Sequence, residues 1–459
     1  MSVSIHAAAT DTEWHGTDFI STQAGFAKEL ADSSGAGLNL YDDSFAEFAN
    51  RTDLPDFDYI GLHGIWSWIS DENRSIIVNF IHKKLKIGGV LYLSYNTMPG
   101  WAAFAPMQHL FRLHNDHNGR PGESLVTRID EAIVFVDKLL DTIPEYAKAN
   151  PLIKEKVQKL KDQNRNYLAH EYFNQNWNPM HFKETLNWLK KAKLDYACSA
   201  NYLHHIDALN LTTEQVEFLN HINDVMFRQT ENDFMVNKGF RKDYWVKGAR
   251  RLSVMEQTEG IRQQKVILTT NRMDVCLNIS GALGEASMSE TIYNPILNVL
   301  ADNKPKTIAQ IELAVNDKGI KWPQITEAIM VLASAGYVAA VQEDALISKR
   351  KMHTDRLNNF IINKARSNSD ILWLASPVIG GGVVVGRFHQ LFLLAIRHGK
   401  KKPEEQAEVA WQILNAQGQK MLKDGKSLDK AEDNLVELKK RASIFAEKYL
   451  PVLKALQVI

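Results

Sequence analysis

Short apolar runs alternate with helical patterns over the first hundred residues, and this alternation limits the possible folds more than any other feature. The strand candidates are "EWHGTDF", "GLNLYD", "FDYIGLHGI" and "GGVLYLSYN", with a helical pattern between each pair. Alternating strands and helices favour a parallel sheet that is covered by helices. The sequence therefore predicts an α/β architecture at the N-terminal end of the chain.

The segment 71–89 predicts the helix that connects the third and fourth of these strands. Ser70 or Asp71 is a suitable N-cap, because both side chains can accept a hydrogen bond from the first helical turn. We expect the pair Gly88-Gly89 to end the helix, since glycine is the usual residue at a helix C-terminus.

The sequence after residue 101 predicts a helical insertion, a pair of edge strands and two C-terminal regions. Residues 102–165 have helical periodicity and charged faces, which indicates a helical insertion. Two later strand candidates, "KLDYACSAN" and "FRKDYWVKGARRL", are expected to pair antiparallel at the sheet edge. We place domain boundaries so that residues 1–255 form the α/β domain, 256–350 a second domain and 351–459 a mainly helical region with the loop "SPVIGGGVVVG".

The second domain has the element order of a winged-helix module. Three helical segments and a short strand follow one another over residues 290–345. Thr307 is the expected N-cap of the second helix, Pro323 fits the first turn of the third, and Gly336 is expected to end it.

Composition excludes several classes of partner. Lys+Arg and Asp+Glu both number 54, and the third helix of the winged-helix segment has no Arg or Lys, so we expect no nucleic-acid partner. No apolar run reaches the roughly 18 residues of a membrane span, and no secretory signal is present, so we expect a cytoplasmic protein. Cys198 and Cys276 match no metal-ligand spacing, and we expect no metal site.

Acidic residues follow the first two predicted strands. Asp18 and Phe19 end the first strand, and Asp42 and Asp43 end the second. A carboxylate at the end of a parallel strand can accept hydrogen bonds from the ribose hydroxyls of a nucleotide, and a second acid can meet the adenine amino group. The alternative for each is a helix cap, which is the commoner role of Asp after a strand.

Six stretches together resemble the class I S-adenosylmethionine-dependent methyltransferases that contain a methyltransferase regulatory domain. They are "EWHGTDF…QAGFAKELA", "YDDSFAEF", "FDYIGLHGIWSWIS", "GGVLYLSYNTMPGW", "YLAHEYFNQNWNPMHF" and "FRKDYWVKGARRL". Some members of that family are bacterial protein lysine methyltransferases with a winged-helix module. The resemblance implies a Rossmann-like sheet, S-adenosyl-L-methionine as cofactor, and a protein or small-molecule methyl acceptor.

The resemblance also implies a strand and a glycine-rich loop that precede the segment 1–10. No G-x-G-x-G occurs before Asp18, so we expect an N-terminally truncated sheet that lacks its first strand and an activity that is impaired by the loss of the cofactor loop. The alternative is a non-catalytic methyltransferase remnant that acts as a protein-interaction or regulatory protein.

The ends of the third and fourth strands supply the catalytic candidates. His63 can take a proton from the acceptor or contact the cofactor, and its alternative role is to fix the loop through hydrogen bonds. Tyr95 and Asn96 end the fourth strand, where the acceptor would arrive. Asn96 has a turn-forming role as its alternative.

Aromatic residues and one short polar run supply the substrate candidates. Trp66 and Trp101 can line the methyl-transfer site, although core packing is at least as good an explanation for Trp66. His170 and Tyr172 in "AHEYF" are candidates for substrate access, with a buried polar anchor as the alternative. Arg241 and Asp243 alternate along one strand face and are expected to form a structural ion pair, with substrate contact as the alternative.

Overall fold

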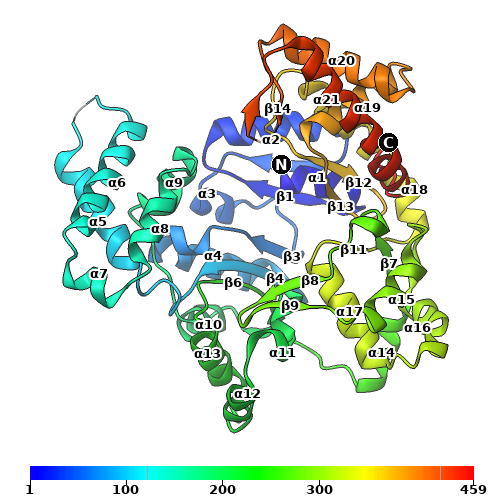
Figure 1. The fold of residues 1–459 in the computed structure, drawn as a ribbon. Helices are drawn as coiled ribbons and strands as arrows, with labels where there is room; N and C mark the ends of the chain where they lie inside the picture. Colours follow the sequence, from blue (N-terminus) through cyan, green and yellow to red (C-terminus); the bar gives the residue numbers. More distant parts are fainter. Residues whose placement is uncertain (121, 424) are drawn as a thin grey trace. The chain divides into compact units, whose positions relative to one another are not determined.

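The computed structural model describes residues 1–120, 122–423 and 425–459 and has a mixed α/β architecture (Figure 1). The chain divides into two compact units. The first contains Met1–Ser44, Leu252–Ile279 and Glu285–Ile459, and the second contains Phe45–Arg251 and Ser280–Gly284. The predicted domain boundaries after residues 255 and 350 stay predictions.

The second unit is built on a four-stranded mixed sheet. Its strands lie in the order β3 (Phe57–Leu62), β4 (Leu85–Asn96), β6 (Phe240–Lys247) and β5 (Leu194–Ser199). Strands β3 and β4 are parallel, whereas β6 runs antiparallel to both β4 and β5. The predicted antiparallel pair at the sheet edge is therefore confirmed.

The expected end of the helix between β3 and β4 was wrong. Helix α4 (Asp71–Lys84) begins at the N-cap Ser70, whose side chain accepts a hydrogen bond from Asn73 N, but it ends at Lys84. Leu85 is already extended and pairs with Phe57 of β3. The register between β3 and β4 then shifts, and Gly88, with φ +82°, lies in this irregular part of the strand. The chain leaves the helix at Lys84 because Leu85 already pairs with β3. Gly88 and Gly89 therefore lie in the irregular part of β4 and do not end the helix.

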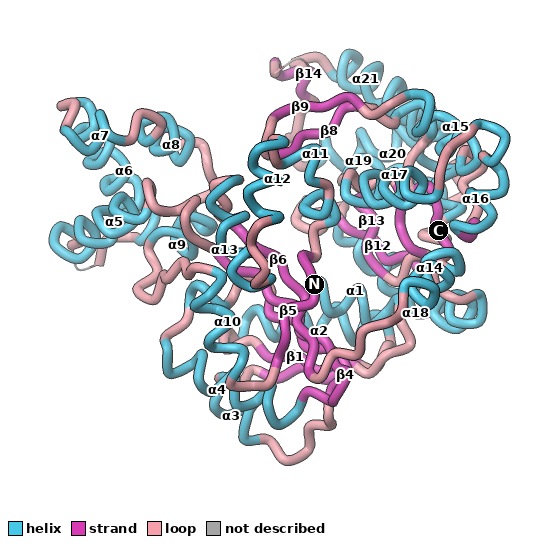
Figure 2. Tube along the Cα trace, turned by 90° about the horizontal axis from the view of Figure 1, so that it is seen from below, coloured by secondary structure: helices cyan, strands magenta, loops and turns pink. Residues whose placement is uncertain are grey.

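The remaining elements of the second unit are helical. They are α3 (Phe45–Asn50), η1 (Trp66–Trp68), α5 (Ala105–Asn118), α6 (Leu125–Asp141), α7 (Glu145–Ala149), α8 (Ile153–Leu160), α9 (Arg165–Tyr172), α10 (Phe182–Lys190), η2 (Tyr202–His205), α11 (Asp207–Asn210), α12 (Thr213–Asn220) and α13 (Val225–Met235). Helices α5 to α8 stand beside the sheet in both views of the chain (Figures 1 and 2). Their apolar faces form a separate core around Phe111, Ile133 and Val157.

The first unit begins with α1 (Ser2–Ala9), β1 (Trp14–Thr17), α2 (Ser21–Ser34) and β2 (Leu38–Tyr41). Strands β1 and β2 are parallel and form a two-stranded sheet, and β3 is the end strand of the other sheet. These strands lie where the apolar runs predicted them. The expectation that a preceding strand is missing from the sheet stays a prediction.

Ile5, Ala8 and Leu30 from the N-terminal segment share one hydrophobic core with residues between 347 and 458. The elements that follow residue 251 are α14 (Val254–Gln263), β7 (Lys265–Leu268), η3 (Arg272–Asp274), β8 (Asn278–Gly281), β9 (Gly284–Ser287), α15 (Glu290–Leu300), β10 (Lys306–Thr307), α16 (Ile308–Ala314), η4 (Asn316–Lys318), α17 (Trp322–Ser334), β11 (Val338–Ala340), α18 (Asp344–Lys364), β12 (Trp373–Ser376), β13 (Gly381–Val384), α19 (Arg387–Arg397), α20 (Pro403–Ala416), β14 (Leu422–Lys423), β15 (Lys426–Ser427), α21 (Ala431–Ile444), η5 (Phe445–Tyr449) and α22 (Leu450–Ala455).

Three of these helices and one strand follow the order predicted for residues 290–345. Thr307 caps α16, Pro323 lies in the first turn of α17, and Gly336 follows this helix with φ +77°. Strands β10, β7 and β11 form a three-stranded antiparallel sheet. The assignment of this region as a winged helix stays a prediction.

The segment 376–386 was expected to be a loop, and this was wrong in part. Residues Gly381–Val384 form β13, which pairs antiparallel with β12. Strands β12 and β13 are joined by a short turn, and antiparallel pairing uses only backbone N–H and C=O groups. The glycines of β13 therefore do not prevent it from pairing. Among the residues that the structure describes, no helix combines the length and apolar character that crossing a membrane requires.

Candidate functional site

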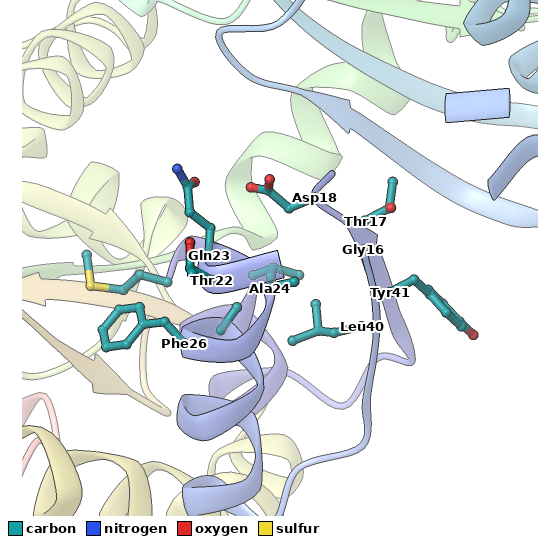
Figure 3. Close-up of a pocket in the computed structure, with 12 residues that line it drawn as sticks. Gly16, Thr17, Asp18, Thr22, Gln23, Ala24, Phe26, Leu40 and Tyr41 are labelled. Atoms are coloured by element: carbon teal, nitrogen blue, oxygen red, sulfur yellow. The ribbon is translucent and has the colours of Figure 1, made fainter. Parts of the chain in front are cut away.

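A cavity of about 480 Å³ lies in the first unit, at the carboxyl end of the two-stranded sheet (Figure 3). It is lined by Gly16, Thr17 and Asp18 from the end of β1, by Leu40 and Tyr41 from β2, by the first turns of α2, and by Met1 and Val3. The lining residues of α2 include Thr22 and Gln23, which the sequence patterns did not identify. In Figure 3 the side chains of Asp18 and Gln23 extend over the start of α2, whereas the Tyr41 ring points away from them.

Asp18 is half-buried and already makes two local hydrogen bonds. Its Oδ1 accepts a hydrogen bond from Ile20 N at 3.0 Å, and its backbone N–H donates to Tyr41 O at 3.1 Å. The first contact is a local turn that precedes α2, whose N-cap is Ile20 and whose first turn receives no side-chain capping hydrogen bond from the described residues. A carboxylate has about four acceptor positions, so the contact leaves Oδ2 free for a ligand. The ribose-binding role of Asp18 stays a prediction.

The other predicted cofactor residues of this unit lie at the same strand ends. Phe19 is 74% exposed. Asp42 accepts a hydrogen bond from Ser21 Oγ at 3.3 Å, and the backbone oxygen of Asp43 accepts one from Thr17 Oγ1 at 2.5 Å. These contacts connect the end of β2 to the end of β1 and the start of α2. They fix the shape of the cavity edge without occupying Asp18 Oδ2.

The second unit carries the remaining candidates, beginning with His63 after β3. His63 is exposed, and its Nδ1 lies 3.1 Å from Tyr92 Oη and 3.3 Å from Ser94 Oγ. Ser94 Oγ also accepts a hydrogen bond from Gly64 N at 2.9 Å. The geometry is that of the loop-fixing alternative, and Nε2 is the ring nitrogen that a proton-accepting role would use.

Tyr95 lies in the core of the second unit. Its side chain is completely buried, and its Oη donates to Asp243 Oδ2 at 3.2 Å. Burial raises the pKa of Tyr95 well above its ordinary value, and the charge of Asp243 adds to this. Asp243 in turn pairs with Arg241 at 2.7 Å, which confirms the ion pair predicted from their alternation on β6.

Asn96 joins the end of β4 to helix α9. It is 2% exposed, and its Nδ2 donates to Glu171 Oε1 at 3.2 Å. Burial raises the pKa of the Glu171 carboxyl, while the hydrogen bond from Asn96 lowers it. Glu171 forms no ion pair with any residue that the structure describes. The run "AHEYF" had pointed to this stretch through His170 and Tyr172, but the sequence could not show that the acid between them faces Asn96.

The predicted substrate residues occupy different environments. Trp66 is fully buried and meets Trp188 edge-on at 6.2 Å, as its core-packing alternative predicts. Trp101 is half-buried, and its Nε1 donates to Gly239 O at 2.7 Å. Its ring lies 6.2 Å from the buried ring of Tyr172, whereas His170 is exposed on α9. The substrate roles of these four residues stay predictions.

No group of three or more His, Cys, Asp or Glu side chains with the arrangement of a metal site occurs in residues 1–120, 122–423 and 425–459.

Comparison with known proteins places the chain in a family. A model of a predicted methyltransferase regulatory domain matches residues 164–247. The uncharacterized protein sll1526 of Synechocystis sp. is 36% identical over 447 residues, which cover 97% of this chain and 87% of the relative. The uncharacterized protein RP789 of Rickettsia prowazekii is 27% identical over 196 residues, or 41% of this chain and 34% of that protein.

Solved structures show the same fold. PKMT2 from Rickettsia typhi, solved in complex with AdoHcy, superposes with a TM-score of 0.65 and 16% identity over 96% of this chain and 89% of its own. A second structure of PKMT2 gives a TM-score of 0.63 and 17% identity, with 97% and 88% covered. The resemblance that the sequence stretches indicated is confirmed. The chain therefore belongs to the family of sll1526, its residues 164–247 match the predicted methyltransferase regulatory domain, and its fold is similar to that of PKMT2.

Proposed function

We propose that the chain is an S-adenosylmethionine-dependent methyltransferase whose acceptor is a lysine side chain of a protein. Its family and fold support the activity, and PKMT2, which shares the fold, was solved with AdoHcy, the form of the cofactor that remains after methyl transfer. The lysine acceptor is the finer part of the proposal and draws on the contacts of Glu171.

The observation that carries the cofactor assignment is the position of Asp18. It ends β1 and lines the cavity of about 480 Å³, where ligands of open α/β sheets bind. Oδ2 makes no hydrogen bond within the part of the chain that the structure describes. It can therefore accept hydrogen bonds from both ribose hydroxyls of a nucleoside. Gln23, in the first turn of α2, also lines this cavity and adds a side-chain amide.

The bound cofactor would supply a methyl group activated by a sulfonium. The acceptor nitrogen needs a free electron pair to attack this methyl carbon, so its proton must be removed first. His63 Nε2 can hold that proton, since Nδ1 is engaged with Tyr92 and Ser94. Asn96 and Glu171 lie together at the carboxyl end of β4 and can position the acceptor.

Glu171 favours an amine acceptor over a hydroxyl or a carboxyl acceptor. A largely buried carboxylate without a cationic partner is unfavourable, and a lysine ammonium that entered beside it would supply the missing charge. Tyr172 follows Glu171 on α9, and the ring of Trp101 lies 6.2 Å from that of Tyr172, so the two rings offer aromatic surface to the methylene groups of a lysine.

Calorimetric titration of S-adenosylhomocysteine into the folded chain tests the cofactor assignment. Asp18→Asn should weaken binding by roughly 10- to 100-fold, because a hydrogen bond to a charged group contributes about 1.5–3 kcal/mol. Asp32→Asn, an exposed change near the other end of α2, is the matched control and should bind as the unmodified chain does. The same titration tests the expected impairment, which predicts weak binding. A folded chain that binds no cofactor would favour the protein-interaction alternative.

Methyl transfer to lysine-containing peptides, followed by mass spectrometry, tests the acceptor. Glu171→Gln should raise KM for the peptide while S-adenosylhomocysteine binding stays unchanged. A chain that binds the cofactor but methylates only hydroxyl or carboxyl acceptors would contradict the lysine assignment without affecting the cofactor assignment.

A further inference from the structure

A second cavity, of about 760 Å³, lies within the second unit and is lined mostly by residues of the matched regulatory domain. Its walls come from β5, η2, α13 and β6, and from the segment that follows β6. Ser199, His204, Lys238 and Arg241 are among the polar residues of the wall, and Val225 and Met226 are among the apolar ones. None of the residues proposed above for cofactor or acceptor binding lines this cavity.

A chain of hydrogen bonds runs from Lys238 into the wall. Lys238 Nζ lies 2.8 Å from His204 Nε2, and His204 Nδ1 lies 2.9 Å from Ser199 Oγ. Because an ammonium group can only donate, Nε2 is the acceptor, and the ring proton is on Nδ1 and points to Ser199. Ser199 Oγ then donates to the backbone oxygen of Lys242 at 3.3 Å. Burial, followed by the charge of Lys238, lowers the pKa of His204 to about 3, so this imidazole is neutral.

Lys238 is largely buried, and no acid among the described residues is paired with it. The two acids near it, Asp233 and Asp243, are both paired with Arg241, at 2.6 and 2.7 Å. Lys238 forms no ion pair within 4.0 Å among the residues described in the structure. Burial lowers the pKa of Lys238 to about 8, with Arg241 contributing in the same direction and the two acids opposing it. The ammonium group therefore lacks a counter-charge that the cavity has room to hold.

We propose that this cavity binds a small molecule through a carboxylate or phosphate group that pairs with Lys238. Arg250 and Arg251, which line the cavity and are exposed, provide further cationic groups for the same kind of ligand. The volume is in the range of about 300–1,000 Å³ that is usual for small-molecule sites. This inference goes beyond the proposed function and does not depend on it.

The backbone beside Lys238 contacts the loop that follows β4. The carbonyl oxygen of Lys238 accepts a hydrogen bond from Gly100 N at 2.8 Å, and that of Gly239 accepts from Thr97 N at 3.0 Å. A Cβ atom at Gly100 would lie only 2.4 Å from Gly239 N, so the two segments are in close backbone contact. An anion at Lys238 would stabilise this arrangement and thereby the loop that leads to Trp101.

Amine-reactive labelling resolved by peptide mass spectrometry tests the role of Lys238 in the unmodified chain. Near pH 8, the labelling rate of Lys238 should fall several-fold when inorganic phosphate or succinate is added at constant ionic strength, because an anion paired with the ammonium group keeps it protonated and covered. Lys242, exposed on β6 shortly after Lys238, serves as the internal control and should be labelled at an unchanged rate. Equal protection of both lysines, or of neither, would overturn the proposal.

Calorimetry with the same two anions supplies a second, independent test. Lys238→Gln should weaken binding by about tenfold or more, as expected for the loss of a charged hydrogen-bond partner, whereas Lys242→Gln should not. Circular dichroism establishes that both variants are folded. Binding of phosphate alone or of succinate alone would support the site and identify its ligand group. Binding of neither anion, or equal binding by a folded Lys238→Gln variant, would overturn it.

Discussion

Arg350 Nε donates a hydrogen bond to the backbone oxygen of Ala8 at 3.2 Å, although 342 residues separate the two in sequence. A second nitrogen of the same guanidinium donates to the backbone oxygen of Ala7. These carbonyl groups belong to the last turn of α1, where helices leave carbonyl groups without partners. The buried guanidinium of α18 therefore caps the C-terminal end of α1 and fixes this helix to α18.

Arg350→Met should destabilise the first unit by about 1–3 kcal/mol, because it leaves two buried carbonyl groups without donors. Urea unfolding measures the change in free energy. Lys349→Met is the matched control, since Lys349 is exposed and pairs with Asp11 at the surface, and its loss should cost less than about 1 kcal/mol. Equal losses in the two variants would contradict the capping role of Arg350.

Asn96→Asp should destabilise the second unit by about 1–3 kcal/mol, because it places a second carboxylate against Glu171 in a largely buried position. Adding Glu171→Gln should restore most of this stability, since the exchanged pair again has one donor and one acceptor. A double-mutant cycle of unfolding free energies measures the coupling. If the two changes are simply additive, the hydrogen bond between these side chains is absent in solution.

The pH dependence of stability should report Asp233. Burial raises the pKa of Asp233 from 3.8 to about 6, against the opposing charge of Arg241. An acid with a raised folded-state pKa binds more protons when folded, so its contribution to stability is present at low pH and is lost as pH rises from about 4 to about 6. Asp233→Asn removes this titration. Relative to the unmodified chain, the variant should therefore become progressively more stable across that interval. Parallel stability curves for the two proteins would contradict the shift.

Trp66→Ala should cost about 3–5 kcal/mol of unfolding free energy, as expected for removing a fully buried large side chain. Phe218→Ala, at an exposed aromatic side chain of the same unit, is the control and should change stability little. A Trp66→Phe variant that keeps its stability but raises KM for the acceptor would instead support the substrate role. These measurements distinguish core packing from substrate contact as the role of Trp66.

The sequence by itself determined the features that depend on neighbouring residues. The strands that precede Asp18, Asp42, His63 and Asn96 follow from runs of apolar residues, and the helix starts at Ser70 and Thr307 follow from side chains that bond within one turn. The ion pair of Arg241 and Asp243 also follows from a two-residue spacing on one strand. Local geometry is sufficient for all of these predictions.

Only the tertiary structure decided which distant segments meet. The sequence gives no sign that the partners of α1 are α18 and the segments after residue 370. It likewise does not show that Glu171 faces Asn96, or that Lys238 faces His204. Helix α4 ends before Gly88 and Gly89 because Leu85 pairs with β3. The stability of a strand depends on its neighbour in the sheet, which lies elsewhere in the chain. Contacts of this kind depend on the path of the whole backbone, which no short pattern of residues contains.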